Sequence, residues 1–307
     1  MLSVKRLTTL VTLGAILAAG AAVATAKKPS GGFKTTGSVI PTALTWAGPI
    51  VCFDPSTEIV PLVRGHRRDG LGRMVYVLDP AQPLGFDVTD WIKTSRKKEQ
   101  DIATLALWLL AESPRARTGA DIYFHNQAHN LLTGLLTHVL LAPEYAGERN
   151  LRGLRKLIAT PKKTLQELLT RMYDEAGSDF VKETVGVFIT MPEDTFSSVH
   201  STAAKDTQWL SVPEYANLVC GDAFKATDIA QGAIDVFLNL STETVKTYPG
   251  LARVIVGALI NALMQANGTH KERVLFLLDE VNLFGTMQTL ETARDEGRKY
   301  GVMLMIY

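Results

Sequence analysis

The chain has 307 residues, of which 46% are hydrophobic and 21% are charged, and its formal net charge is +1. This composition predicts a globular protein with a sizeable core, and it excludes collagen-like, coiled-coil and disulfide-scaffold proteins. The balance of charge also excludes a polybasic nucleic-acid coat or an acidic disordered tail as the whole protein, although a local DNA-binding surface needs only a few well-placed cations. The two cysteines, Cys52 and Cys220, cannot form a disulfide framework.

The amino terminus contains an uncharged apolar run, Leu7–Ala26, between two pairs of basic residues. Its length suits a helix that crosses a bilayer core of about 30 Å. A membrane anchor and a signal peptide, with Ala24-Thr25-Ala26 as its exit site, are the favoured interpretations. A buried strand of small residues at Ala21–Ala26 is the third. We therefore expect residues 1–28 to be a membrane anchor or a signal-like segment.

Five short apolar runs have the pattern of strands that are buried on both faces. Several end in Asp-Pro or in adjacent acidic residues, and segments with helical spacing separate them. They predict an α/β fold with a parallel sheet and helices on both of its faces. The runs are Gly48–Asp54, Met74–Asp79, Ile234–Leu240, Val274–Glu280 and Val302–Tyr307.

The pattern becomes helical between about residues 97 and 199. Asp101–Glu112 and Ala120–Leu141 have helical spacing, and Thr160-Pro161 predicts a further helix with threonine as its N-cap and proline at its first position. We therefore expect an all-helical insertion in the α/β fold. The apolar segment Leu251–Ala266 predicts the helix that returns the chain to the sheet.

A glycine-rich turn followed by Lys-Thr lies at Pro29–Thr36, ahead of a run that is compatible with a helix. Glycines let successive backbone N–H groups converge on phosphate oxygens, and a helix N-terminus adds its dipole. In such a site Lys34 would reach the β/γ phosphates and the Thr35 hydroxyl would hold Mg²⁺. The match to G-x-x-x-x-G-K-[ST] is imperfect, since Lys28 and Phe33 occupy its glycine positions, and a flexible surface turn is the alternative.

The run Val274–Glu280 ends in two adjacent carboxylates. In a phosphate-hydrolysing site Asp279 would join the Mg²⁺ shell and Glu280 would polarise the attacking water. Ligands bind at the carboxyl edge of such a sheet, where this pair would meet Lys34 and Thr35. The alternative is a buried strand that ends in an acidic turn. Asp54–Glu58 follows a strand at the same edge, and it either lines that pocket or forms a capped Asp-Pro turn.

Other polar patterns are weaker indications of function. His125 and His129 have the spacing of metal ligands on a helix, but no third ligand accompanies them, so we expect no metal site there. The basic clusters His66–Arg68, with Arg73, and Arg96–Lys98 are more typical of solvated faces than of DNA contacts.

Beyond these separate motifs, the chain resembles the TraG-type coupling proteins of conjugation and type IV secretion. The resemblance extends from about Pro29 to Tyr307, and four blocks carry it in the order found in the family. The blocks are GGFKTTGSVIPTALTW, VCFDPSTEIV, LFLLDEV and ETARDEGRKYGV. The resemblance implies a RecA-like P-loop ATPase fold, with residues 29–96 and 200–307 as two parts of a nucleotide-binding domain, the second incomplete, around an all-α domain at residues 97–199.

The resemblance also implies the residues of the site and its cofactors, ATP and Mg²⁺. Asp279 and Glu280 would be the Walker B pair, with Lys34 and Glu280 catalytic and with Thr35 and Asp279 on the metal. Variant P-loops of the Gly-Gly-Phe-Lys-Thr kind are frequent in the family. The P-loop residues here would be Gly31, Gly32, Phe33, Lys34, Thr35 and Thr36.

Members of this family are hexameric ATPases of the bacterial inner membrane whose catalytic part faces the cytoplasm. The implied partners are a relaxase–DNA complex, single-stranded or plasmid DNA, components of the secretion channel and further copies of the chain. Family members place a two-helix anchor, a linker and a strand before the P-loop, and further strands and a trans arginine after Walker B. We therefore expect a copy truncated at both ends. The alternatives are a catalytically impaired remnant and an exported soluble protein with a cleaved leader.

Overall fold

The computed structural model describes residues 34–110 and 118–307. The expectations for Leu7–Ala26 and for Gly31, Gly32 and Phe33 concern residues outside these ranges. The chain divides into two compact units, Met1–Lys34 and Thr35–Tyr307, and the fold described below is that of the second unit.

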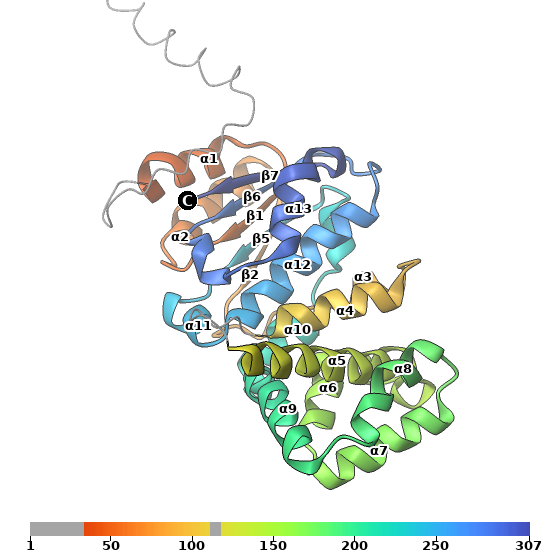
Figure 1. Ribbon diagram of the computed structural model, residues 1–307. Helices are drawn as coiled ribbons and strands as arrows, with labels where there is room; N and C mark the ends of the chain where they lie inside the picture. The colour runs from red at the N-terminus through yellow and green to blue at the C-terminus, as the bar shows by residue number, and fades with distance from the viewer. Residues whose placement is uncertain (1–33, 111–117) are drawn as a thin grey trace, which may run out of the picture. The chain divides into compact units, whose positions relative to one another are not determined.

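A five-stranded sheet lies within this unit, in the order β2-β5-β1-β6-β7, and all its neighbouring strands run parallel (Figure 1). Each of the five apolar runs forms one of these strands, which confirms the predicted α/β fold. The strands are β1 (Ile50–Phe53), β2 (Met74–Leu78), β5 (Ile234–Leu238), β6 (Val274–Leu278) and β7 (Val302–Ile306).

Helices cover both faces of the sheet. On one face Ile50 and Cys52 of β1 pack with Val39 and other side chains from the first two helices. On the opposite face Val51 and Phe53 belong to the core that the later helices complete. This alternation is the period-two pattern of a strand buried on both sides. The covering helices are η1 (Thr35–Val39), α1 (Ile40–Thr45), α2 (Ile59–Gly65), η2 (His66–Gly70), α11 (Thr242–Thr247), α12 (Pro249–Gln265), η6 (Val281–Phe284), α13 (Gln288–Glu296) and η7 (Gly297–Tyr300).

The predicted helical insertion is present between two short antiparallel strands, β3 (Phe86–Asp87) and β4 (Gly221–Asp222). The backbones approach closely here, because a Cβ on Gly221 would lie 2.4 Å from the carbonyl carbon of Gly85. The insertion therefore begins and ends at one place. Its helices are α3 (Asp90–Lys93), α4 (Lys98–Leu109), α5 (Gly119–Leu141), η3 (Pro143–Tyr145), α6 (Leu151–Ile158), α7 (Lys162–Glu175), α8 (Asp179–Ile189), α9 (Glu193–Asp206), η4 (Gln208–Ser211) and α10 (Pro213–Cys220), and η5 (Ala226–Ile229) follows β4.

One predicted helix start is wrong by a single position. Helix α7 begins at Lys162, and Pro161 occupies the N-cap position with extended angles of φ −55° and ψ 143°. The Thr160 hydroxyl donates to the carbonyl oxygen of Leu157 at 2.7 Å, so it closes the last turn of α6 and leaves the start of α7 to proline.

Within residues 34–110 and 118–307, none of the helices combines the length and the apolar character that crossing a bilayer requires.

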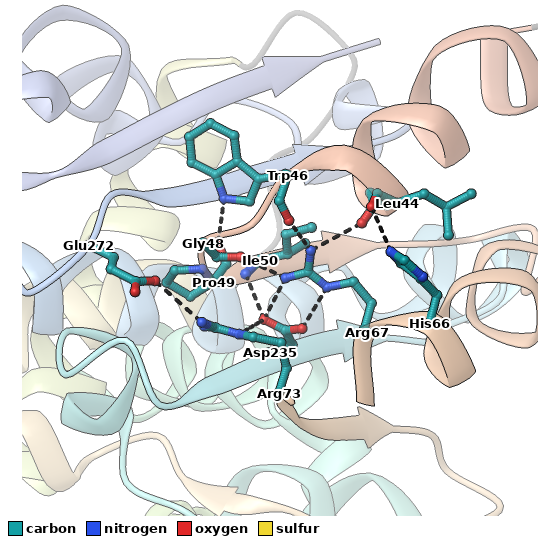
Figure 2. Close-up of polar contacts among 11 residues, drawn as sticks. Leu44, Trp46, Gly48, Pro49, Ile50, His66, Arg67, Arg73, Asp235 and Glu272 are labelled. Atoms are coloured by element: carbon teal, nitrogen blue, oxygen red, sulfur yellow. Dashed lines mark hydrogen bonds and ion pairs between the residues drawn. The ribbon is translucent and has the colours of Figure 1, made fainter. Parts of the chain in front are cut away.

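A buried ionic cluster at the amino edge of the sheet corrects the solvated-face interpretation for Arg67 and Arg73, whereas His66 and Arg68 are exposed as expected (Figure 2). Arg67 is fully buried, and only 9% of the Arg73 side chain is exposed. Arg67 Nε and Nη2 donate to the two carboxylate oxygens of Asp235 at 2.8 and 3.0 Å, and Arg73 Nε donates to Asp235 Oδ1 at 3.3 Å. A carboxylate inside an apolar strand requires such partners, because an unpaired buried charge is very costly.

The same cluster holds the segment that connects α1 to β1. The Arg67 guanidinium donates to the carbonyl oxygens of Ala43, Trp46 and Gly48, which end α1 and lead into β1 (Figure 2). Asp235 also accepts from the backbone N–H of Ile50 at 3.1 Å. The end of α1 and the start of β1 are therefore fixed to β5, and this in turn positions the helical segment that begins with Thr35.

Candidate functional site

Acidic side chains follow neighbouring strands at the carboxyl edge of the sheet. Phe53 of β1 pairs with Leu278 of β6, so Asp54 and Asp279 leave adjacent strands at the same level. Both are buried, at 0% and 8% exposure. Burial raises the pKa of the neighbouring Cys52 thiol well above its ordinary value, and the charges of Asp54 and Asp279 raise it further. This edge is therefore a region of concentrated negative charge.

Asp54 organises the turn that follows β1. Its Oδ2 accepts the backbone N–H of Ile59 at 2.7 Å, and its Oδ1 accepts the hydroxyl of Ser56 at 2.7 Å. These bonds fix the start of α2, which confirms the capped Asp-Pro turn. Thr57, in the middle of the turn, has a positive φ of 60°. Both carboxylate oxygens of Asp54 therefore accept hydrogen bonds that hold the turn between β1 and α2.

The two adjacent carboxylates of β6 lie in different environments. Asp279 is buried, whereas Glu280 is exposed and has left-handed backbone angles of φ 51° and ψ 44°. The Glu280 backbone N–H donates to Asp279 Oδ1 at 3.0 Å. A left-handed non-glycine residue costs about 1–3 kcal/mol, and such strained residues cluster at functional sites. The turn separates a buried carboxylate from one that can reach solvent, which suits the predicted division between metal ligand and water-polarising base.

The helical turn η1, which contains Thr35 and Thr36, reaches the same edge. Its last residue, Val39, is buried in the core that also contains Cys52 and Leu277. Tyr307, which follows β7, packs against the same core, and its backbone N–H donates to the carbonyl oxygen of Leu278 at 3.2 Å. The end of η1 and Tyr307 therefore pack beside the strand end that leads into Asp279.

The assignment of phosphate-binding, metal-binding and catalytic residues stays a prediction. Lys34 is helical and half-buried, and it belongs to the unit Met1–Lys34. Gly31, Gly32 and Phe33 lie outside the described ranges.

A polar pair at this edge was missed by the sequence analysis. Asn239, after β5, donates from Nδ2 to Asp79 Oδ2 at 2.7 Å, and Asp79 follows β2. The Asn239 Oδ1 atom is buried without a hydrogen-bond partner. The signal that identified Asp279, a polar residue directly after a predicted strand, also applies to Asp79 and Asn239. Asp79 and Asn239 follow β2 and β5, the two strands that continue the sheet beyond β1.

The two weaker sequence patterns lie in the helical insertion. His129 Nε2 makes a 2.8 Å hydrogen bond with the carbonyl oxygen of Ala103, so this histidine links α5 to α4. Arg96 and Lys97 are exposed, as expected for a solvated face, and they line an open groove of about 520 Å³ beside the start of α4.

The chain matches a family model described as "Type IV secretory system Conjugative DNA transfer" over residues 16–307. It is 47% identical over 285 residues to the type IV secretion system-coupling protein VirD4 of Bartonella henselae, a match that covers 91% of this chain and 44% of that protein. It is 48% identical over 278 residues to the conjugal transfer protein TraG of Agrobacterium fabrum, covering 90% of this chain and 42% of that protein. The chain spans less than half the length of these two relatives.

Solved structures of the coupling protein TrwB are similar in fold. The trigonal form of TrwBdeltaN70 in complex with sulphate has a TM-score of 0.59 at 15% identity, and the match covers 87% of this chain and 57% of that chain. The complex with the non-hydrolysable ATP analogue ADPNP has a TM-score of 0.54 at 15% identity, covering 85% of this chain and 63% of that chain. This similarity confirms that the chain shares the α/β fold of these structures. With a family match over most of its length, the chain belongs to the type IV secretory system conjugative DNA transfer family.

Proposed function

We propose that this chain is the nucleotide-hydrolysing part of a coupling protein, which uses ATP binding and hydrolysis to deliver relaxase-bound DNA to a type IV secretion channel. The observation that carries this proposal is the pair formed by buried Asp279 and exposed, left-handed Glu280 at the carboxyl edge, beside the helical turn of Thr35. Membership of the conjugative DNA transfer family supports the biological process.

The donor set fits a magnesium nucleotide. Carboxylate and hydroxyl oxygens, here from Asp279 and Thr35, are the ligands that Mg²⁺ prefers. The backbone N–H groups of Gly31–Thr36 would hold the phosphates, and the Lys34 ammonium would neutralise charge at the β/γ phosphates. When bound, Mg²⁺ supplies charge neutralisation at the transferring phosphoryl group. A TrwB structure was solved in complex with ADP and Mg²⁺, which supports this assignment of cofactors.

In this mechanism Glu280 orients and polarises the attacking water. Its exposure allows it to reach a water molecule, and its backbone bond to Asp279 Oδ1 fixes the Asp279 carboxylate against the backbone of Glu280. Asp54 keeps the adjacent turn in shape through Ser56 and Ile59.

The proposal also covers the cellular location, the assembly and the partners of the protein. The chain would act at the bacterial inner membrane with its catalytic part in the cytoplasm, as a homo-oligomer of the hexameric kind. Its partners would be the relaxase–DNA complex and components of the secretion channel.

The test is Mg²⁺-ATP binding and turnover by the full chain, compared with Lys34→Ala and Glu280→Gln. We expect Lys34→Ala to lose binding, and Glu280→Gln to bind nucleotide while turnover falls by about 10²–10⁴, as for loss of a general base. Glu296→Gln, a carboxylate at the end of α13, is the matched control and should leave both unchanged. Unchanged turnover in Glu280→Gln, or unchanged binding in Lys34→Ala, would refute the assignment, provided that circular dichroism shows folded protein.

A further inference from the structure

The indole of Trp108 connects the helical insertion to the segment that follows Glu280. Trp108 lies in the last turn of α4 and is 3% exposed. Its Nε1 donates to the hydroxyl oxygen of Thr289 at 3.2 Å. Thr289 is the second residue of α13 and is itself 7% exposed. The bond therefore joins two buried groups from opposite parts of the chain.

The indole ring occupies a slot in α12 that glycine creates. A Cβ on Gly257 would lie 2.7 Å from the ring of Trp108, and a Cβ on Gly250 would lie 2.9 Å from the carbonyl oxygen of Leu109. The end of α4 therefore packs directly against the backbone of α12. Because packed interiors transmit strain, α4 cannot shift here without moving the indole and its hydrogen bond.

The segment between Asp279 and Thr289 is held at both ends. At its start, the backbone N–H of Asp279 donates to the carbonyl oxygen of Phe53 at 3.4 Å, and the rings of Phe53 and Phe284 lie 4.9 Å apart. At its end, Thr289 accepts the bond from Trp108. The left-handed conformation of Glu280 lies between these two attachments, and such a conformation persists only where the surroundings over-determine it.

We propose that Trp108 is a positioning residue for the carboxylate pair. It holds the start of α13, and α13 in turn holds the turn of Glu280. The helical insertion and the hydrolytic site are therefore energetically coupled. The role assigned to Glu280 rests on the proposed function, whereas the mechanical link does not. Coupling of this kind is reciprocal. A macromolecule that displaces α4 on docking therefore shifts the conformational equilibrium of the Glu280 turn. A change at the carboxyl edge shifts the conformational equilibrium of α4 by the same free energy.

Amide hydrogen exchange of the full chain without nucleotide tests the link. Trp108→Phe keeps an aromatic ring in the glycine slot but removes the N–H donor, and Thr289→Val keeps the shape of threonine but removes the acceptor. We expect each variant to exchange about fivefold faster in residues 281–290, the effect of one neutral buried hydrogen bond. The double variant should show no further increase, because both changes remove the same interaction.

Trp91→Phe is the matched control. Trp91 donates from Nε1 to the carbonyl oxygen of Val88 at 2.8 Å, and its ring lies 6.0 Å from that of Trp108. The substitution removes an indole hydrogen bond nearby whose acceptor, Val88, lies outside α13. It should leave exchange in residues 281–290 unchanged, and amides of β1 should keep their protection in all three single variants.

Equal acceleration of residues 281–290 in Trp108→Phe and Trp91→Phe, unchanged exchange in Trp108→Phe, or additive effects in the double variant would each overturn the inference. Turnover provides the second measurement, in which Trp108→Phe and Thr289→Val should lower kcat by a similar factor and leave KM unchanged, because only the water-polarising side is displaced. If exchange changes as expected but neither the parent chain nor any variant turns over ATP, the mechanical link is supported and the proposed function is refuted. Failure of the link can therefore be distinguished from failure of the proposed function.

Discussion

Replacing Asp235 with asparagine tests the buried cluster at the amino edge of the sheet. The substitution keeps the size of the side chain and removes the charge that faces Arg67, whose guanidinium is fully buried. Arg67 would keep its bonds to the carbonyl oxygens of Ala43 and Gly48, but it would lose its ionic partner. Breaking a buried ion pair from one side costs about 3–5 kcal/mol, because it leaves an uncompensated charge.

A loss of this size is a large fraction of the 5–15 kcal/mol that stabilises a typical domain, and it corresponds to a fall in Tm of roughly 10 °C. Urea denaturation followed by circular dichroism measures it. The matched control is Asp69→Asn, which breaks the adjacent ion pair of Arg68 and Asp69, where both side chains are at least 60% exposed. That control should leave the urea midpoint unchanged. Equal urea midpoints for Asp235→Asn and Asp69→Asn would show that the cluster contributes no net stability and would refute the argument.

Three further perturbations have definite expected results. Gly257→Ala places a methyl group 2.7 Å from a buried indole, so it should destabilise the chain by about 1–3 kcal/mol in urea denaturation, whereas Gly65→Ala, where a Cβ meets nothing within 4 Å, should not. Glu280→Gly accommodates the positive φ of 51° without a side chain, so we expect turnover to be lost while Tm is retained; a clear fall in Tm would contradict the left-handed strain. Burial raises the pKa of Asp90 to about 6 from 3.8, although the backbone N–H of Ala226 lowers it. Between those pH values the folded state binds the proton more tightly than the unfolded state, so this carboxyl increasingly destabilises the fold as pH rises from about 4 to 6. Asp90→Asn should remove that part of the pH dependence, and equal slopes for variant and parent would contradict it.

The strands were predictable because parallel strands buried on both faces leave continuous apolar runs in the sequence. The predicted runs were longer than the strands at their carboxyl ends, as at Asp54 and Asp279, where the polar residue belongs to the following turn. The same feature located the acidic pair correctly at the edge of the sheet. The left-handed conformation of Glu280 had no sequence signal, since only glycine marks such a position reliably.

The partner of a buried charge was not predictable from the sequence. The basic cluster around Arg67 has the composition of a solvated surface, and nothing local distinguishes Arg67 from the exposed Arg68 beside it. The informative residue was Asp235, a carboxylate within the apolar run Ile234–Leu240, which implied a buried cation somewhere in the fold. Its identity depends on the pairing of distant segments, which no local pattern encodes. The bond between Trp108 and Thr289 was hidden for the same reason.

The pairing of β1 with β6 has a consequence for the order in which the protein forms. These neighbouring strands, aligned from Ile50 opposite Leu275, lie near opposite ends of the described sequence. During synthesis β5 leaves the ribosome before β6, so β1 gains its second neighbouring strand only when β6 has been made. The helices of the insertion, from α3 to α10, are all synthesised between β1 and β6, so they can form before β6 is available. The carboxyl edge that holds Asp54 and Asp279 on adjacent strands is thus completed only when β6 has joined the sheet.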